Sequence, residues 1–126
     1  MEDTILEWAD TSVGTGDFGA TAFLFRGKEF GHIHQNGDLD ITFGAGITTE
    51  LLKNNLVEKH LYVPKTNITY PLRNEEKLEF GISLLRMSYL SLVKNLNQSD
   101  ADSQRLFEQE LAKLPEHLSS IYLKQE

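Results

Sequence analysis

Two glycine turns divide one stretch of the chain into three short segments of β-forming residues, and this arrangement constrains the fold more than any other feature. Thr21 to Arg26 is followed by Gly27-Lys28, a two-residue loop that places glycine first. Glu29 to His34 then turns through Asn36-Gly37 into Asp38 to Phe43. Three strands joined in sequence by tight turns predict an antiparallel sheet.

The flanking segments supply further elements. The opening residues Ile5, Leu6 and Trp8 form a short amphipathic stretch, and the glycine-rich segment Val13 to Gly19 is interpreted as a loop. After the three strands, Thr48 to Asn55 is expected to form a short helix with Thr48 as its N-cap. Two more strands are expected, at His60 to Val63 and at Ile68 to Pro71.

The longest helix is predicted after Asn74, which is a favourable N-cap followed by two glutamates. Its apolar residues recur at helical spacing and form one stripe: Leu78, Ile82, Leu85, Tyr89, Leu92, Val93 and Leu96. A further helical region begins near Asp102, and Pro115 is expected to start a new turn there. The order βββαββαα predicts a single α+β domain with about five antiparallel strands and helices on one face.

Composition limits the class of protein. The chain has 126 residues, no cysteine, and 12 Lys and Arg against 19 Asp and Glu, which gives a formal charge of −7. Proteins that bind nucleic acid backbones are typically basic, so we expect no nucleic acid partner. The acidic start, Met1 to Trp8, has no signal-peptide pattern, and no apolar run is long enough to span a bilayer. We therefore expect a cytoplasmic protein that does not contact a membrane.

The second turn determines where the histidines point. His32 and His34 alternate along one strand and share a face. With a two-residue loop, His32 would lie opposite Ile41. With Gln35 added to the loop and Gly37 in a bulge, His32 would instead lie opposite Asp40 and His34 opposite Asp38. We predict the second register, because only it separates polar from apolar side chains.

Extending this face across the first hairpin adds aromatic residues to the histidines and aspartates. The predicted pocket is lined by Phe23, Phe25, Phe30, His32, His34, Asp38 and Asp40. The alternative is that His32 and Asp40 form a structural pair and that the phenylalanines fill a second core layer.

A metal site is a further possibility. His32 and His34, together with Asp40 or His60, would provide three ligands. We nevertheless expect no stoichiometric metal, because two aspartates opposite two histidines can pair with one another without a cation. His117 is expected at the surface, away from this cluster.

Several segments resemble the luciferase-domain family, which contains mostly uncharacterised bacterial proteins together with the fungal luciferases. The resemblance covers Phe18 to Leu90. The similar segments are Gly27 to His34, Gly37 to Asp40, Glu58 to His60, Tyr62 to Pro64, Thr69-Tyr70 and Leu84 to Tyr89. Residues 97–126 form a helical extension outside the shared region, and its last helix is a candidate contact for a homo-oligomer.

The resemblance implies a function. Fungal members oxidise a hydroxylated pyrone with molecular oxygen and no redox cofactor. By similarity, His32, His34, Asp40 and His60 are candidate catalytic residues, and Tyr70 and Tyr89 join Asp38 and the three phenylalanines as candidate substrate contacts. We expect a planar small-molecule ligand and no cofactor.

The competing hypothesis is a non-enzymatic binding or interaction module with structural histidines. The element order also resembles double-wing domains of the MmcQ/YjbR type, for which DNA binding is proposed, although the negative charge argues against it.

Overall fold

The computed structural model describes residues 1–95 and 101–125. Its sheet has six antiparallel strands in the order β1-β2-β3-β4-β6-β5. The strands are β1 (Thr11–Thr15), β2 (Thr21–Phe25), β3 (Lys28–Ile33), β4 (Asp38–Thr42), β5 (Glu58–Lys59) and β6 (Asn67–Pro71). The helices are α1 (Glu2–Leu6), the short 3-10 turn η1 (Asp17–Gly19), α2 (Ala45–Lys53), α3 (Glu75–Lys94), α4 (Ala101–Leu111) and α5 (Glu116–Lys124).

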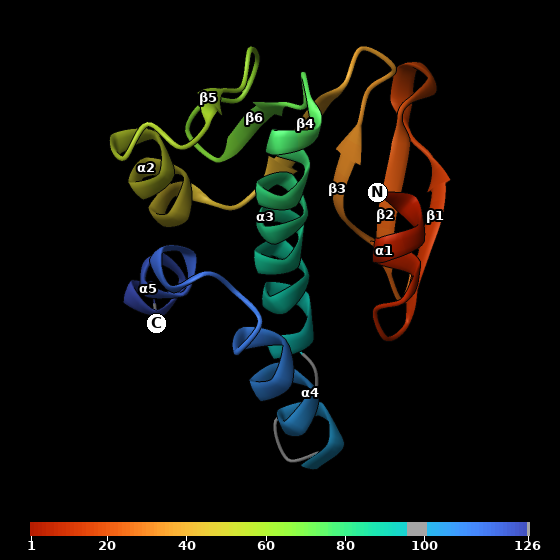
Figure 1. Ribbon diagram of the computed structural model, residues 1–126, viewed down its shortest axis with the longest axis vertical. Helices are drawn as coiled ribbons and strands as arrows, with labels where there is room; N and C mark the ends of the chain where they lie inside the picture. The colour runs from red at the N-terminus through yellow and green to blue at the C-terminus, as the bar shows by residue number, and fades with distance from the viewer. Residues whose placement is uncertain (96–100, 126) are drawn as a thin grey trace.

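Helix α3 organises the core. It runs across the sheet, with α1 near one edge, α2 and α5 on the other side, and α4 beyond its C-terminal end (Figure 1). Leu84, Leu85 and Met87 of α3 are fully buried. The core also contains Leu39 and Ile41 of β4, so this helix covers the face of the sheet to which those residues point. The α+β class and the helices on one face are confirmed.

The N-cap predicted for the longest helix and the break predicted at Pro115 are confirmed. The Asn74 side chain accepts a hydrogen bond from the Lys77 backbone N–H and begins α3. Pro115 stands immediately before α5, as its missing N–H favours. Leu96, the last residue of the predicted stripe, and the start of the extension at 97–100 lie outside the described residues.

Three local predictions were wrong. Residues 11–15 form the edge strand β1 rather than the start of a loop, because five backbone pairs to β2 outweigh the low β-propensity of Gly14. Helix α2 begins after Gly44, whose φ of +84° turns the chain, so Thr48 lies inside the helix and is buried. The strand expected over His60 to Val63 is a loop, and the short strand β5 precedes it.

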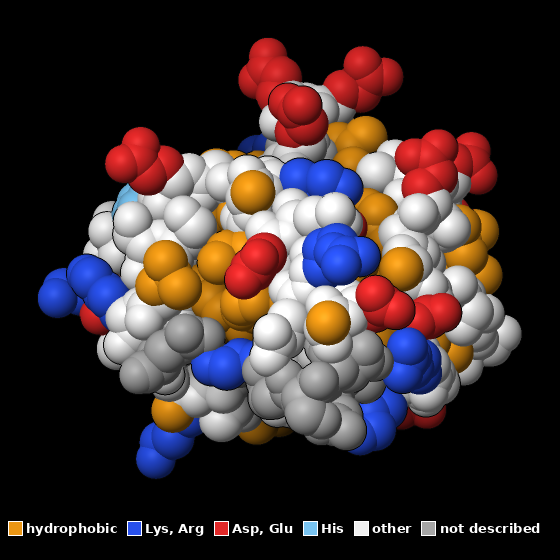
Figure 2. All heavy atoms as spheres, turned by 90° about the horizontal axis from the view of Figure 1, so that it is seen from below, with side chains coloured by type: hydrophobic (Ala, Val, Ile, Leu, Met, Phe, Trp, Pro, Cys, Tyr) orange, Lys and Arg blue, Asp and Glu red, His pale blue; other side chains and the backbone are white. Residues whose placement is uncertain are grey.

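The end of the molecule formed by α4 and α5 has a mixed surface. Figure 2 shows Lys and Arg side chains scattered among Asp and Glu side chains on this face. Among the described residues, no helix is long and apolar enough to cross a membrane.

Candidate functional site

The β3–β4 hairpin has the predicted register. His32 pairs with Asp40, and Ile33 pairs with Leu39. The loop is Gln35-Asn36-Gly37, closed by a hydrogen bond of 2.9 Å from the His34 backbone N–H to the Asp38 carbonyl. Gly37 has a φ of +92°, which glycine adopts without strain. The histidines and aspartates therefore lie on the face of the sheet opposite α3.

One carboxylate lies at the centre of this face. Asp40 is 7% exposed, and its Oδ2 lies 2.8 Å from His34 Nε2, 3.5 Å from His32 Nε2 and 3.7 Å from His60 Nε2. Its other oxygen, Oδ1, accepts a hydrogen bond of 2.6 Å from the Thr69 hydroxyl. A buried carboxylate is stable only when such donors surround it. Three imidazoles and one hydroxyl provide them here.

The loop after β5 fixes the orientation of His60. Its Nδ1 accepts hydrogen bonds of 3.1 Å from the backbone N–H groups of Tyr62 and Val63. An acceptor nitrogen carries no proton, so the ring proton of His60 is on Nε2, the nitrogen nearest Asp40. His60 therefore joins this loop to the carboxylate.

The pKa values of His32 and Asp40 are shifted in opposite directions. The hydrogen bond of His32 to Asp40, which outweighs burial and is reinforced by Glu29, raises its pKa from 6.5 to about 9. Glu29 lies 3.0 Å from His32 Nδ1, so both ring nitrogens face carboxylates and both are donors. Burial would raise the pKa of Asp40, but hydrogen bonds from His32, Thr69 and His34 lower it from 3.8 to about 2. His32 is thus a cation and Asp40 an anion at neutral pH.

These groups line a cavity of about 590 Å³, a size typical of small-molecule sites. The wall of the cavity includes five of the predicted residues: His32, His34, Asp38, Asp40 and His60.

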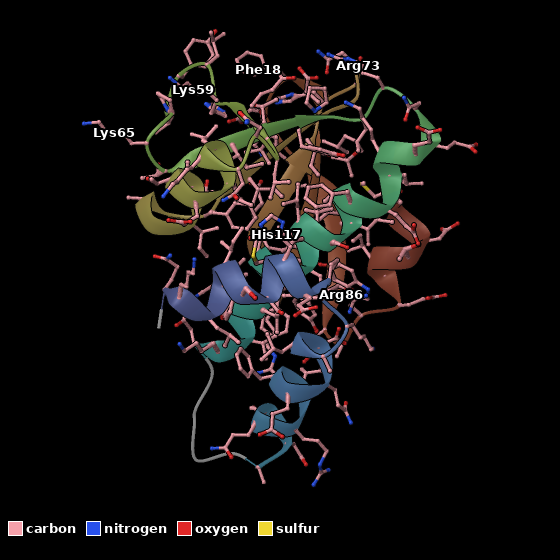
Figure 3. The ribbon with its side chains drawn as sticks, turned by 60° about the vertical axis from the view of Figure 1, so that its left-hand side comes forward. Phe18, Lys59, Lys65, Arg73, Arg86 and His117 are labelled. Carbon is pink, nitrogen blue, oxygen red and sulfur yellow. The ribbon has the colours of Figure 1, made fainter. Side chains whose placement is uncertain are left out.

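Several other lining residues were not predicted from the sequence, among them Thr69, Phe18, Leu61 and Tyr62. Thr69 could be found only from the β4–β6 pairing, which places it opposite Asp40. Figure 3 shows Phe18, Lys59 and Arg73 across the sheet from α4 and α5, and His117 on α5 away from them.

The three phenylalanines do not lie on the histidine face, and that prediction was wrong. Phe23, Phe25 and Phe30 are at most 3% exposed and belong to the core. The β2–β3 loop is Arg26-Gly27, not Gly27-Lys28, so Phe25 pairs with Lys28. A bulge opposite Phe23 and Leu24 then leaves Phe30 unpaired. As a result Ala22, rather than Phe23, lies opposite His32.

The remaining predicted contacts are divided between the two faces. Tyr70 pairs with Leu39 and packs against Phe80, on the core side. Tyr89 is fully buried, and its hydroxyl donates to the Ala9 carbonyl at 2.8 Å. Neither lines the cavity, because each belongs to the packing around α3. Asp38 does line it, and its Oδ1 forms an ion pair of 3.0 Å with Arg73.

A metal ion could be held by one set of described residues. His32, His34 and Asp40 each offer one ligand atom, and these atoms lie within 4.8 Å of one another. The same atoms are already joined as charge-assisted pairs. Metal binding would require His32 to lose a proton. The His60 nitrogen nearest Asp40 carries a proton, so it offers no lone pair to a metal. The set therefore has the ligand number of a metal site, and a metal would have to replace the pairs that these atoms form with one another.

The fold and the site define an α+β domain with a carboxylate and histidine site on the open face of its sheet. Residues 27–88 are similar to the family described as Luciferase domain. The match includes His32, His34, Asp40, His60 and Thr69, which confirms the resemblance inferred from the sequence. No curated protein and no solved structure gives a significant match.

Proposed function

We propose that the cavity binds a planar, weakly acidic small molecule and that His34 removes a proton from it. The observation that carries this proposal is the convergence of three imidazoles on the buried Asp40 inside a cavity of suitable size. Such a cluster of coupled titratable groups in a cleft is typical of sites that move protons.

His34 is the best candidate for the base. Its Nε2 is the donor to Asp40, because a carboxylate only accepts. Nδ1 then keeps its lone pair, and no described residue forms a hydrogen bond with it. A carboxylate in this position fixes the orientation of the imidazole ring. The neighbouring His32, a cation, would stabilise the anion formed from the ligand.

The similarity to the luciferase-domain family suggests oxidation of the ligand by molecular oxygen. Loss of a proton to His34 leaves an enolate or phenolate. A carbon of this anion would form a bond to dioxygen, which accepts the electron pair, and the proton on His34 would return to the distal oxygen. The product is a hydroperoxide of the substrate, so substrate and dioxygen account for all atoms and electrons.

Binding and ionisation can be tested together with umbelliferone, a planar hydroxylated benzopyrone whose neutral and anionic forms absorb at different wavelengths. We expect binding near neutral pH with a shift of the bound ligand toward its anion. His34→Asn should remove that shift, whereas His117→Asn, at an exposed site on α5, should not change it. Binding of neither umbelliferone nor a panel of hydroxypyrones and phenols would favour the non-enzymatic module.

A further inference from the structure

The cavity has a rim that differs in chemistry from its floor. We define the floor as His32, His34, Asp40, His60 and Thr69, and the rim as Phe18, Leu61 and Tyr62. The rim side chains are 97%, 80% and 83% exposed, respectively, and all three line the cavity. Large apolar side chains exposed together around a cavity are typical of a ligand-binding surface. The floor offers only polar groups.

The rim comes from two separate parts of the sheet. Phe18 lies in η1, between β1 and β2, whereas Leu61 and Tyr62 lie between β5 and β6. The strands β3 and β4, which carry most of the floor, are between these two pairs in the strand order. Apolar side chains therefore flank the polar floor from both sides.

Both rim segments are held in place. Phe18 has a φ of +56°, a left-handed conformation that is rare for an aromatic residue. The turn that carries it is closed by hydrogen bonds from Gly16 N–H to the Ala20 carbonyl and from Ala20 N–H to the Asp17 carbonyl. The opposite segment is held by the two backbone hydrogen bonds to His60 Nδ1. The same histidine that contacts Asp40 thus positions Tyr62.

We propose that Phe18 and Tyr62 contact the flat face of the ligand and determine which ring sizes the cavity accepts. This inference rests on the proposed function. Aromatic side chains on both sides of a polar floor favour a planar ligand whose acidic edge faces His34 and whose ring surface faces the rim. A second protein chain would suit the rim less well, because a polar hollow separates its two halves.

The test compares umbelliferone, which has two fused rings, with phenol, which has one. In the wild-type chain we expect umbelliferone to bind more tightly. Phe18→Ala and Tyr62→Ala should each weaken umbelliferone binding about 3- to 10-fold and change phenol binding less. Leu123→Ala, at an exposed site on α5, is the matched control and should leave both affinities unchanged.

The possible results separate this inference from the proposed function. If umbelliferone binds and responds to His34→Asn but not to the rim variants, the rim proposal is wrong and the proposed function stands. If the wild type binds neither compound, both are overturned. If Phe18→Ala instead abolishes self-association measured by sedimentation, without a change in ligand affinity, the rim is a protein contact and the proposal fails.

Discussion

The two faces of the β3–β4 hairpin are formed by alternate residues of the same strands, but they are stabilised in different ways. On one face, Leu39 and Ile41 are almost completely buried under α3. On the other, His32, His34 and Asp40 share a hydrogen-bonded cluster beside the cavity. The free energy gained from apolar burial is a sum over many side chains, whereas the polar cluster depends on one carboxylate. The core face should therefore determine stability, and the cavity face should determine ligand chemistry.

Truncation of the core face should have the largest effect. Leu85 of α3 is fully buried, and Leu85→Ala is expected to lower the free energy of unfolding by about 2 to 5 kcal/mol through lost burial and a cavity. Urea denaturation would measure it. A loss below about 1 kcal/mol would contradict the assignment of this helix face.

Gly31 of β3 provides an internal control for that contact. A Cβ atom added there would clash with Leu85 Cδ2, so Gly31→Ala should destabilise the wild-type chain. In a Leu85→Ala background the clash is absent. The cost of Gly31→Ala should therefore be smaller in the double variant than in the single one.

The polar face is tested by Asp40→Asn. This change removes the charge that three imidazoles share, and we expect a loss of about 1 to 3 kcal/mol in the free energy of unfolding. It should also abolish the ionisation of bound umbelliferone. Asp38→Asn is the matched control, since Asp38 pairs with Arg73 rather than with the histidines. An effect of Asp38→Asn as large as that of Asp40→Asn would show that the cluster has no single centre.

The hairpin also shows which features of the site the sequence alone predicts and which it does not. The position of His32 opposite Asp40 could be predicted because the turn glycine and the separation of polar from apolar residues are local signals. The burial of Phe23 and Phe25 could not, because a bulge at Phe30 reverses the alternation and leaves no signal in composition. Thr69 was missed for a different reason, since it reaches Asp40 through a pairing between strands that are 29 residues apart.

The pH dependence of stability should follow the two shifted groups. The pKa of His32 is raised to about 9, so its stabilisation is complete below 6.5 and is lost as the pH rises toward 9. The pKa of Asp40 is lowered to about 2, so its contribution is present above 3.8 and is lost as the pH falls toward 2. Because the His32 side chain is 28% exposed, we expect an alkaline loss of only about 1 to 2 kcal/mol.

Proton NMR of the imidazole resonances would measure this titration directly. The raised pKa of His32 should fall toward 6.5 in Asp40→Asn and by a smaller amount in Glu29→Gln, because Asp40 is the larger cause of the shift. An unchanged titration of His32 in Asp40→Asn would contradict the coupling between the two groups.

A smaller effect is expected at the rim. Phe18 is exposed and left-handed, so it contributes strain and almost no burial to the folded state. Asparagine tolerates this backbone conformation better. Phe18→Asn should therefore raise the free energy of unfolding by up to about 1 kcal/mol while it weakens umbelliferone binding. A lower free energy of unfolding in Phe18→Asn would show that the Phe18 ring packs against the protein and is not free to contact a ligand.

The smallest effect is expected from a metal chelator. His32, His34 and Asp40 have the ligand number of a transition-metal site. However, these atoms already form charge-assisted pairs with one another, and a metal would have to replace those pairs. EDTA should therefore leave the thermal midpoint unchanged, and elemental analysis should find less than one metal ion per chain. One transition metal per chain, lost in His34→Ala but kept in His117→Asn, would overturn this prediction and would reassign the cluster from proton transfer to metal binding.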